Sequence, residues 1–294
     1  MSIRWGVSPI AWSNDDMPEL GGDTPLEDIF NDIREVGFEG VELGGRFPKD
    51  PSELKAMLGG LDLIGGWYSG SLLVQDADAE IAAMQPHLDL LKAMGSKVFV
   101  FAETSNAVHG NRSVPLSGTP RLAANDWKAF GERMSGVADY VASQGLKFAY
   151  HHHLGTVVET AADMDDFIAA TSPSVGFTLD TGHAALGGVN SLAVIRDHPE
   201  RVVHVHCKDV RWETFTKARK GGSSFLDGVL SGMFTVPGDG GIDYAEIMQA
   251  LRRMDYSGWI VIEAEQDPAL ANPRKYAELG LKTLKDRAAE AGLI

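Results

Sequence analysis

The 294-residue sequence contains a single cysteine, Cys207. One thiol can form neither an internal disulfide nor a cysteine-based zinc site, so a metal in this chain needs histidine and carboxylate ligands. Basic residues are also few, because 26 Lys and Arg stand against 41 Asp and Glu, a net charge of −15. A surface this acidic repels phosphate backbones and anionic lipids, so we expect neither nucleic acid nor membrane as a partner.

Long apolar runs are absent as well, since the sequence has no stretch of about 18 consecutive apolar residues. Residues 1–6 lack the basic stretch and apolar run that begin a secretory signal. These absences predict a cytoplasmic protein. The 44% hydrophobic and 23% charged residues are ordinary globular composition, which excludes a disordered chain or a fibrous repeat.

Short apolar runs rich in β-branched and aromatic residues alternate with longer segments of helical period along the whole chain. Their nearly continuous apolar character is typical of parallel strands buried on both faces. Eight such runs are predicted to be strands, namely residues 3–8, 40–43, 61–68, 97–102, 147–152, 175–180, 202–206 and 259–264.

Helix signals lie between the predicted strands. Thr24 followed by Pro25 is typical of a helix start, and Gly37 of its end. Asp50 and Glu53 have the spacing of a capping box. Repeated strand–helix pairs of this number predict an α/β fold, a single (β/α)8 TIM-barrel domain over residues 1–294.

An open doubly wound sheet is the structural alternative, but it often carries a glycine-rich phosphate loop after its first strand, which residues 9–14 lack. Two connections exceed normal loop length, residues 103–124 after strand four and 207–243 after strand seven. Both follow strands, on the face where barrel enzymes hold their sites. We expect residues 207–243 to be a mobile lid, so that deleting residues 217–224 lowers turnover more than melting temperature.

The histidines are distributed unevenly, with six of nine at or just beyond the ends of the fifth, sixth and seventh predicted strands. These six are His151, His152, His153, His183, His204 and His206. Asp180 ends the sixth strand, Lys208 follows the seventh, and Glu263 and Glu265 end the eighth. Alternate residues of a strand share a face, so such groups can point into one barrel mouth.

A single polar residue at a strand end often only satisfies backbone groups. Four neighbouring strands that deliver imidazoles or carboxylates to one end favour a metal or substrate site instead, because burying so many polar groups unpaired is costly. Histidine and carboxylate ligands suit Mn²⁺, Co²⁺ or Mg²⁺, and Zn²⁺ fits as well.

Weaker candidates lie elsewhere in the sequence. Trp12 and Trp67 follow or end the first and third strands, where they could wall a pocket for a polyol ring, although isolated aromatics more often belong to the core. The Gly-Asp-Gly at residues 238–240 is interpreted as a turn.

Several motifs carry a family resemblance. The segments DTGH at 180–183, HVHCKD at 204–209 and WIVIE at 259–263 resemble the xylose isomerase-like sugar isomerase/epimerase superfamily. More narrowly, the sequence is similar to the inosose dehydratase family, and the likeness covers essentially the whole chain. It rests on YHHHLGT at 150–156, GMFTVPGDG at 232–240, EAEQDP at 263–268 and PIAWSNDD at 9–16.

The resemblance implies a divalent metal held by residues from strands five to eight. Asp180, His206 and Glu263 match three of the superfamily's ligands. Where the superfamily has a glutamate on strand five, this chain has His151, which we expect as the fourth ligand. The change removes one of the two glutamate bases that epimerases use on opposite faces of the substrate, which argues against epimerisation.

The resemblance further implies dehydration of 2-keto-myo-inositol (scyllo-inosose) to a trihydroxycyclohexane-1,2-dione in inositol catabolism. Mn²⁺ or Co²⁺ is the expected metal, and the family description adds glutathione. The chemistry needs a cation to stabilise an enolate, a base for the α-proton and an acid for the leaving hydroxyl. The candidate bases are His153 and Glu265.

The candidate acids or oxygen clamps are His183 and Lys208, while Asn14 and Arg211 are weaker candidates for contacts with substrate hydroxyls. The expected partner is a small polyol ketone, and a homo-oligomer is left open. Three other functions are considered. They are a metal-dependent ketose epimerase or isomerase, a phosphodiesterase related to endonuclease IV, which the net charge of −15 disfavours, and a non-catalytic polyol-binding protein.

Overall fold

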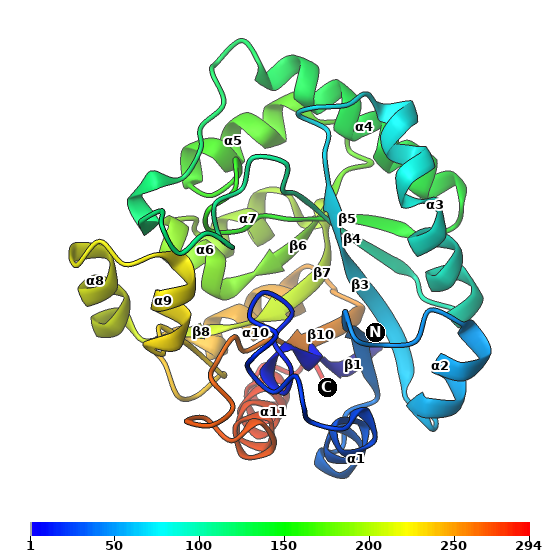
Figure 1. The fold of residues 1–294 in the computed structure, drawn as a ribbon, viewed down its shortest axis with the longest axis vertical. Coiled ribbons are helices and arrows are strands. Elements are labelled where there is room, and N and C mark those ends of the chain that lie inside the picture. The colour runs from blue at the N-terminus through cyan, green and yellow to red at the C-terminus, as the bar shows by residue number, and fades with distance from the viewer. Residues whose placement is uncertain (1) are drawn as a thin grey trace.

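A computed structural model describes residues 2–294. Eight parallel strands form a closed barrel in the order β1–β10–β7–β6–β5–β4–β3–β2, with helices around it (Figure 1). The strands are β1 (Ile3–Val7), β2 (Gly40–Leu43), β3 (Asp62–Gly70), β4 (Val98–Glu103), β5 (Lys147–His151), β6 (Gly176–Asp180), β7 (Val202–Cys207) and β10 (Gly258–Ile262). The predicted TIM barrel is confirmed, and every predicted strand end lies within about two residues of the observed one.

The helices follow the strands along the chain and cover the outside of the barrel (Figure 1). They are α1 (Leu26–Val36), α2 (Pro51–Leu58), α3 (Ala77–Met94), α4 (Trp127–Ser143), α5 (Ala161–Ala170), α6 (Thr181–Gly187), α7 (Ser191–Asp197), α8 (Trp212–Lys220), α9 (Phe225–Leu230), α10 (Tyr244–Arg253) and α11 (Pro273–Glu290). Asp50 caps α2 by accepting from the backbone N–H groups of Ser52 and Glu53. Helix α1 begins one residue later than predicted, with Pro25 at its N-cap.

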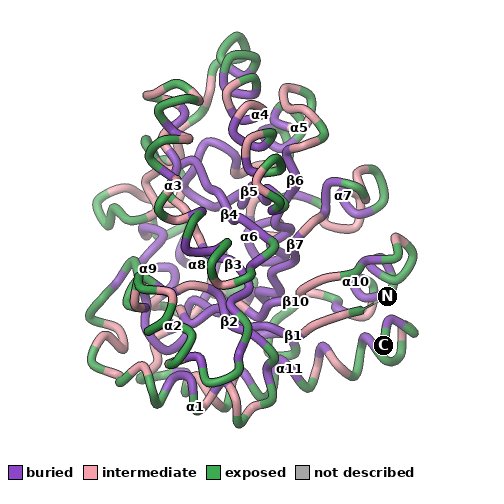
Figure 2. The backbone as a smooth tube through the Cα atoms, turned by 90° about the vertical axis from the view of Figure 1, so that its right-hand side faces the viewer, coloured by how far each residue is buried: buried purple, intermediate pink, exposed green. Residues whose placement is uncertain are grey.

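The barrel strands are buried, whereas exposure is concentrated on the outer helices and connections (Figure 2). Strand β6, for example, is buried at all five of its residues. Burial on both faces explains why these strands read as continuous apolar runs rather than as alternating ones. It also means that a charged side chain inside the barrel needs a partner. Over residues 2–294, no helix combines the length and the apolar character needed to cross a membrane.

The segment after β7 differs from the prediction. It contains helices α8 and α9 and a small antiparallel sheet of β8 (Asp209–Val210) and β9 (Phe234–Thr235). Its side chains join a second apolar cluster made of Met17, Leu154, Leu186, Val210, Phe215, Phe225, Leu226, Val229, Met233 and Phe234. Residues 221–224, whose glycine and serine content predicted a flexible loop, form the turn between the two helices. Ser224 caps α9 through its side chain.

The segment does lie over the barrel mouth, because the Phe225 ring is 5.0 Å from the His153 ring. It is also tied to the long connection after β4, where the Leu116 N–H donates to the Ser223 carbonyl at 2.8 Å. The segment therefore covers the site as packed helices rather than as a loose loop, and its movement as a lid stays a prediction. Glycine and serine indicate a turn. The apolar residues on either side of this turn join the second apolar cluster, so both flanking helices pack against the rest of the protein.

This packing makes residues 207–243 a part of the folded body, and a core substitution there tests it. We expect Leu226→Ala to lower the free energy of unfolding by about 2–5 kcal/mol, with a melting temperature several degrees lower, because Leu226 is only 4% exposed. The control is Leu279→Ala at a 40% exposed position, which should change stability by no more than about 0.5 kcal/mol. A wild-type melting curve for Leu226→Ala would instead show a detachable lid.

Candidate metal centre and catalytic site

Four side chains at the carboxyl ends of neighbouring strands bring one ligand atom each to a common centre. They are His151 at the end of β5, Asp180 at the end of β6, His206 on β7 and Glu263 directly after β10. His151 Nε2 is 3.6 Å from Asp180 Oδ2 and 3.8 Å from Glu263 Oε2. His206 Nδ1 is 3.8 Å from Asp180 Oδ2 and 3.1 Å from Glu263 Oε2.

These separations and the unpaired atoms of the cluster fit a divalent metal. Ligands about 2.1 Å from an ion lie about 3.0–3.5 Å from one another, so the four atoms need only small shifts to coordinate one. Asp180 Oδ2 and both ring nitrogens of His151 are buried without a hydrogen-bond partner. Burying such atoms unpaired is costly, and a cation between them would remove that cost.

The fold fixes the orientation of Asp180. Its side chain is the N-cap of α6, where Oδ1 accepts a hydrogen bond from the His183 N–H at 2.8 Å. A capping carboxylate has one oxygen committed to the helix. The other oxygen, Oδ2, is thereby directed toward His151 and His206.

His206 is oriented by a residue that the sequence analysis missed. Glu42 on β2 accepts hydrogen bonds at Oε1 from Nε2 of His206 (2.9 Å) and from Nε2 of His204 (2.8 Å). The Nε2 proton is held by Glu42, so Nδ1 faces Asp180 and Glu263 and would offer its lone pair to a metal once deprotonated, the arrangement by which carboxylates orient metal-binding histidines. A lone acidic residue inside the apolar segment 40–43 was the only signal in the sequence.

Burial and charge compete over the protonation of this pair. Burial opposes ionisation of Glu42, but His206 and His204 outweigh it and lower the pKa of Glu42 to about 2. Burial also disfavours the charged form of His206, yet Glu42 and Glu263 raise the pKa of this imidazole well above its usual value. A metal must therefore displace a proton from His206, and its affinity must fall as the pH falls.

A second polar cluster lies beside the first. Glu265 Oε1 is 3.4 Å from His183 Nε2 and 3.9 Å from His153 Nε2, and it accepts a hydrogen bond from the Lys208 ammonium. Burial raises the pKa of Glu265 to about 7, although Lys208 lowers it. His153 Nδ1 is 2.7 Å from the Leu154 carbonyl oxygen, so its proton lies there and Nε2 keeps the lone pair. Burial and the nearby cations lower the pKa of His153 well below its usual value, so this imidazole is neutral.

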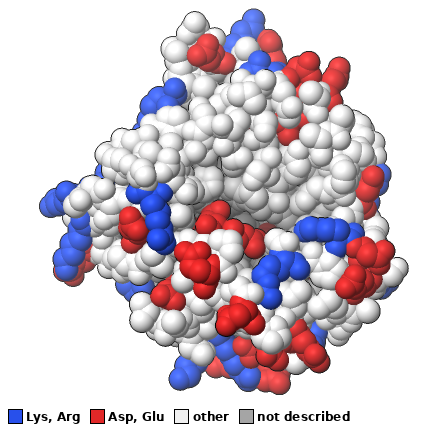
Figure 3. All heavy atoms as spheres, viewed as in Figure 1, with Lys and Arg blue, Asp and Glu red and all other residues white. Residues whose placement is uncertain are grey.

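A cavity of 520 Å³ opens onto both clusters. Figure 3 shows a hollow near the centre of this face, with acidic atoms at its edge. His151, His153, His206, Glu263 and Glu265 line its floor. The set of polar groups at its base and a size suited to a small molecule are typical of an enzyme site.

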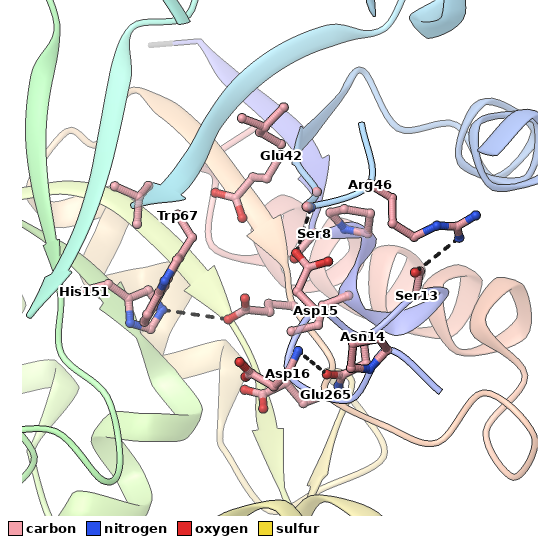
Figure 4. Close-up of a pocket in the computed structure, with 18 of the residues that line it drawn as sticks. Ser8, Ser13, Asn14, Asp15, Asp16, Glu42, Arg46, Trp67, His151 and Glu265 are labelled. Atoms are coloured by element: carbon pink, nitrogen blue, oxygen red, sulfur yellow. Dashed lines mark hydrogen bonds and ion pairs between the residues drawn. The ribbon is translucent and has the colours of Figure 1, made fainter. Parts of the chain in front are cut away.

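Trp67 and Asn14 occupy opposite walls of this cavity (Figure 4). The Trp67 ring stands edge-on to His151, with ring centroids 5.2 Å apart. Asn14 is 2% exposed, and its Oδ1 accepts from the backbone N–H groups of Asp16 and Met17, while its Nδ2 has no partner. Both side chains line the cavity, so the predicted contact of each with the substrate stays a prediction that this position allows.

Two other predicted substrate contacts do not line the cavity, which corrects the prediction. Trp12 is buried, and its indole N–H donates to Asp32 on α1 at 3.0 Å, so it belongs to the core. Arg211 donates to the carbonyl of Gly232 at 2.8 Å and pairs with Asp239 at 2.5 Å. It therefore holds together the base of the α8–α9 segment, and Asp239 serves the turn expected at residues 238–240.

Two predicted acids or oxygen clamps, His183 and Lys208, are buried behind Glu265 and are also absent from the cavity wall. Their role as acids or oxygen clamps stays a prediction. Other wall residues were not predicted as site residues, either because their motif was given no role, as for residues 15 and 16 of PIAWSNDD, or because they come from connections without a motif. Among them are Asp15, Asp16, Arg46 and His109.

The family described as "Xylose isomerase-like TIM barrel" matches residues 30–287. The chain belongs to this family. The Rhizopine catabolism protein MocC of Rhizobium meliloti is 46% identical over 294 residues, covering 99% of this chain and 90% of that protein. The Inosose dehydratase of Geobacillus thermodenitrificans is 39% identical over 279 residues, 94% of each chain. The predicted resemblance to inosose dehydratases is thereby confirmed.

Among experimental structures, a xylose isomerase domain protein from Alicyclobacillus acidocaldarius superposes with a TM-score of 0.70 at 19% identity. The match covers 99% of this chain and 100% of that one. Similarity at this level of identity shows the fold alone.

Asp180 is a sharp test of the metal centre, because it has both a capping and a ligating oxygen. We expect Asp180→Asn to keep the α6 cap through its carbonyl oxygen. Its metal affinity should fall by more than about 10–100-fold, which is the loss typical of removing a residue that only orients a ligand. The control is Asp50→Asn, which changes the cap of α2 at the surface and should bind metal normally. Equilibrium dialysis and circular dichroism would measure both variants. Unchanged Mn²⁺ affinity in folded Asp180→Asn would remove this residue from the centre.

Glu42 predicts a pH effect of defined sign. Without its charge the pKa of His206 falls, so the midpoint of Mn²⁺ binding in Glu42→Gln should move to lower pH. At high pH, where the proton no longer competes, affinity should still be about 10–100-fold weaker because the imidazole is less well oriented. Glu39→Gln, at an exposed position near the same strand, should change neither quantity. A midpoint that stayed in place or moved upward would contradict the role given to Glu42.

Proposed function

We propose that this protein removes water from scyllo-inosose to give a trihydroxycyclohexane-1,2-dione in inositol catabolism. The observation that carries the proposal is a joint one. The chain is 39% identical to an inosose dehydratase over 94% of both chains, and its cavity brings a metal-ligand cluster next to two groups able to transfer protons. The α-proton of a polyol ketone is removed only where negative charge on its oxygen is stabilised.

A divalent cation held by His151, Asp180, His206 and Glu263 supplies positive charge for the keto oxygen of the substrate. Proton transfer falls to His153 and Glu265, the two titratable groups of the second cluster that face the cavity. One takes the α-proton, and the other protonates the β-hydroxyl, which leaves as water. Trp67 and the free amide of Asn14 bound the space in which the ring lies.

Epimerisation of a ketose is the alternative reaction for such a barrel. It needs a base on each face of the reacting carbon, and in this superfamily one of them is the glutamate that His151 replaces. The unpaired Nε2 of His151 lies among the other three ligand atoms, so this imidazole is better placed to bind metal than to take a proton. The dehydratase is therefore favoured.

Activity with scyllo-inosose is the direct test. Absorbance of the dione should appear with metal-loaded protein and disappear after chelation. We expect His153→Gln and Glu265→Gln each to lower kcat by about 10²–10⁴-fold, the range for loss of a general acid or base. His198→Gln, between the end of α7 and the start of β7 and so at the opposite end of the barrel strands from the mouth, should keep wild-type turnover. Interconversion of a ketohexose pair at a rate near that with inosose would overturn the dehydratase assignment in favour of an epimerase.

Further properties are part of the same proposal. We propose Mn²⁺ or Co²⁺ as the metal, because two imidazoles and two carboxylates suit these ions. A single domain over residues 1–294 and a cytoplasmic location stay predictions, and the oligomeric state stays open. A role for glutathione rests on the family resemblance alone.

A further inference from the structure

Lys208 is a fully buried lysine that the mechanism above does not use. Its ammonium contacts Glu265 Oε1, lies 2.9 Å from His183 Nε2 and lies 3.0 Å from Glu263 Oε2. It also stands 4.8 Å above the centre of the Phe234 ring. A buried ammonium is costly unless it is paired, so the side chain is held by these groups in one place.

Two of the groups that this ammonium contacts belong, with His153, to a set of side chains of the kind that bind metal ions. His153, His183 and Glu265 each offer one ligand atom, and these atoms lie within 4.8 Å of one another. The separations from Glu265 Oε1, 3.4 Å to His183 Nε2 and 3.9 Å to His153 Nε2, are close to those between ligands of one ion. Two imidazoles and a carboxylate form a common catalytic zinc set.

The hydrogen bonds of the two imidazoles agree with this interpretation. His153 holds its proton on Nδ1, so the lone pair of Nε2 faces the cluster. His183 faces two donors, the Leu154 N–H at Nδ1 (3.2 Å) and the Lys208 ammonium at Nε2 (2.9 Å). A neutral imidazole has one lone pair, so His183 accepts only one of these two hydrogen bonds at a time, and a metal at Nε2 would require its proton on Nδ1.

We propose that His153, His183 and Glu265 form a second cation site, which the ammonium of Lys208 fills in place of a metal ion. The barrel mouth then holds one divalent ion and one lysine. Their three positive charges lie next to the three carboxylates of Asp180, Glu263 and Glu265. The ammonium contacts Glu265 and His183, so the Nε2 lone pair of His153 stays available for proton transfer, which a metal bound by all three groups would prevent.

The local backbone is shaped to bring the lysine there. Gly182, at the start of α6, lies against the Lys208 stem, and a Cβ at this position would approach Lys208 Cγ to 2.8 Å. A larger residue would push the stem and its ammonium away from the cluster. The apolar contacts of the stem would be kept by methionine, which has a similar length and no charge.

The test is the number of Zn²⁺ ions bound per chain, measured by equilibrium dialysis and metal analysis. Lys208→Met should bind one more Zn²⁺ than the wild type. The double variant Lys208→Met/Glu265→Gln should lose this additional ion, because it lacks one of the three ligands. Lys217→Met, which removes an exposed lysine of α8, should bind the same number as the wild type. Because the readout is a difference in stoichiometry, it does not depend on the substrate or on turnover.

Folded Lys208→Met with the wild-type number of ions would overturn the proposal. If Lys208→Met does not fold without metal, because three carboxylates then lack a cation, the proposal predicts that added Zn²⁺ restores its circular dichroism spectrum. Zn²⁺ should not restore the double variant. Failure of Zn²⁺ to restore Lys208→Met, or equal restoration of both variants, would likewise contradict a metal site at these residues.

Discussion

The site depends on one constraint, the negative charge of Asp180 and Glu263. These two carboxylates lie close together at the carboxyl ends of the barrel strands. Their ligand oxygens lie within 4.8 Å of each other and are almost shielded from water. At that distance two unit charges repel by about 3–4 kcal/mol at an effective dielectric constant of about 20. The repulsion is a cost of folding that only nearby positive charge offsets. A metal ion, the protonatable imidazoles and Lys208 are all placed to supply it.

The arrangement of the surrounding residues follows from this need. Asp180 is held by the start of α6, His206 by Glu42 on the opposite side of the barrel, and Glu265 by Lys208. These three groups are thus each fixed by a partner from a different strand or helix. The closed barrel allows this because its parallel strands all end at one mouth. The α8–α9 segment covers the mouth with Phe225 and Phe234, which lowers the local dielectric and strengthens every charge interaction beneath.

The sequence predicted those features that depend on local pattern or on strand direction. Buried parallel strands are continuous apolar runs, so the strand ends were predicted to within about two residues. Because the ends of parallel strands converge, the sequence also predicted that four polar residues meet there, namely His151, Asp180, His206 and Glu263. The partnership of Glu42 with His206 was beyond this reasoning, since the two residues are 164 positions apart. Side-chain direction was equally hidden. Nothing local distinguishes Trp67, which faces the cavity, from Trp12, whose indole hydrogen-bonds to Asp32.

The central claim is that one divalent ion, bound by these four side chains, enables the dehydration. The most direct measurement titrates metal-stripped protein with Mn²⁺ and follows, in the same samples, bound Mn²⁺ by electron paramagnetic resonance and dione formation from scyllo-inosose by absorbance. The account predicts that both rise together and saturate at one ion per chain. Full turnover in samples without bound Mn²⁺, or one tightly bound ion without any dione, would contradict it.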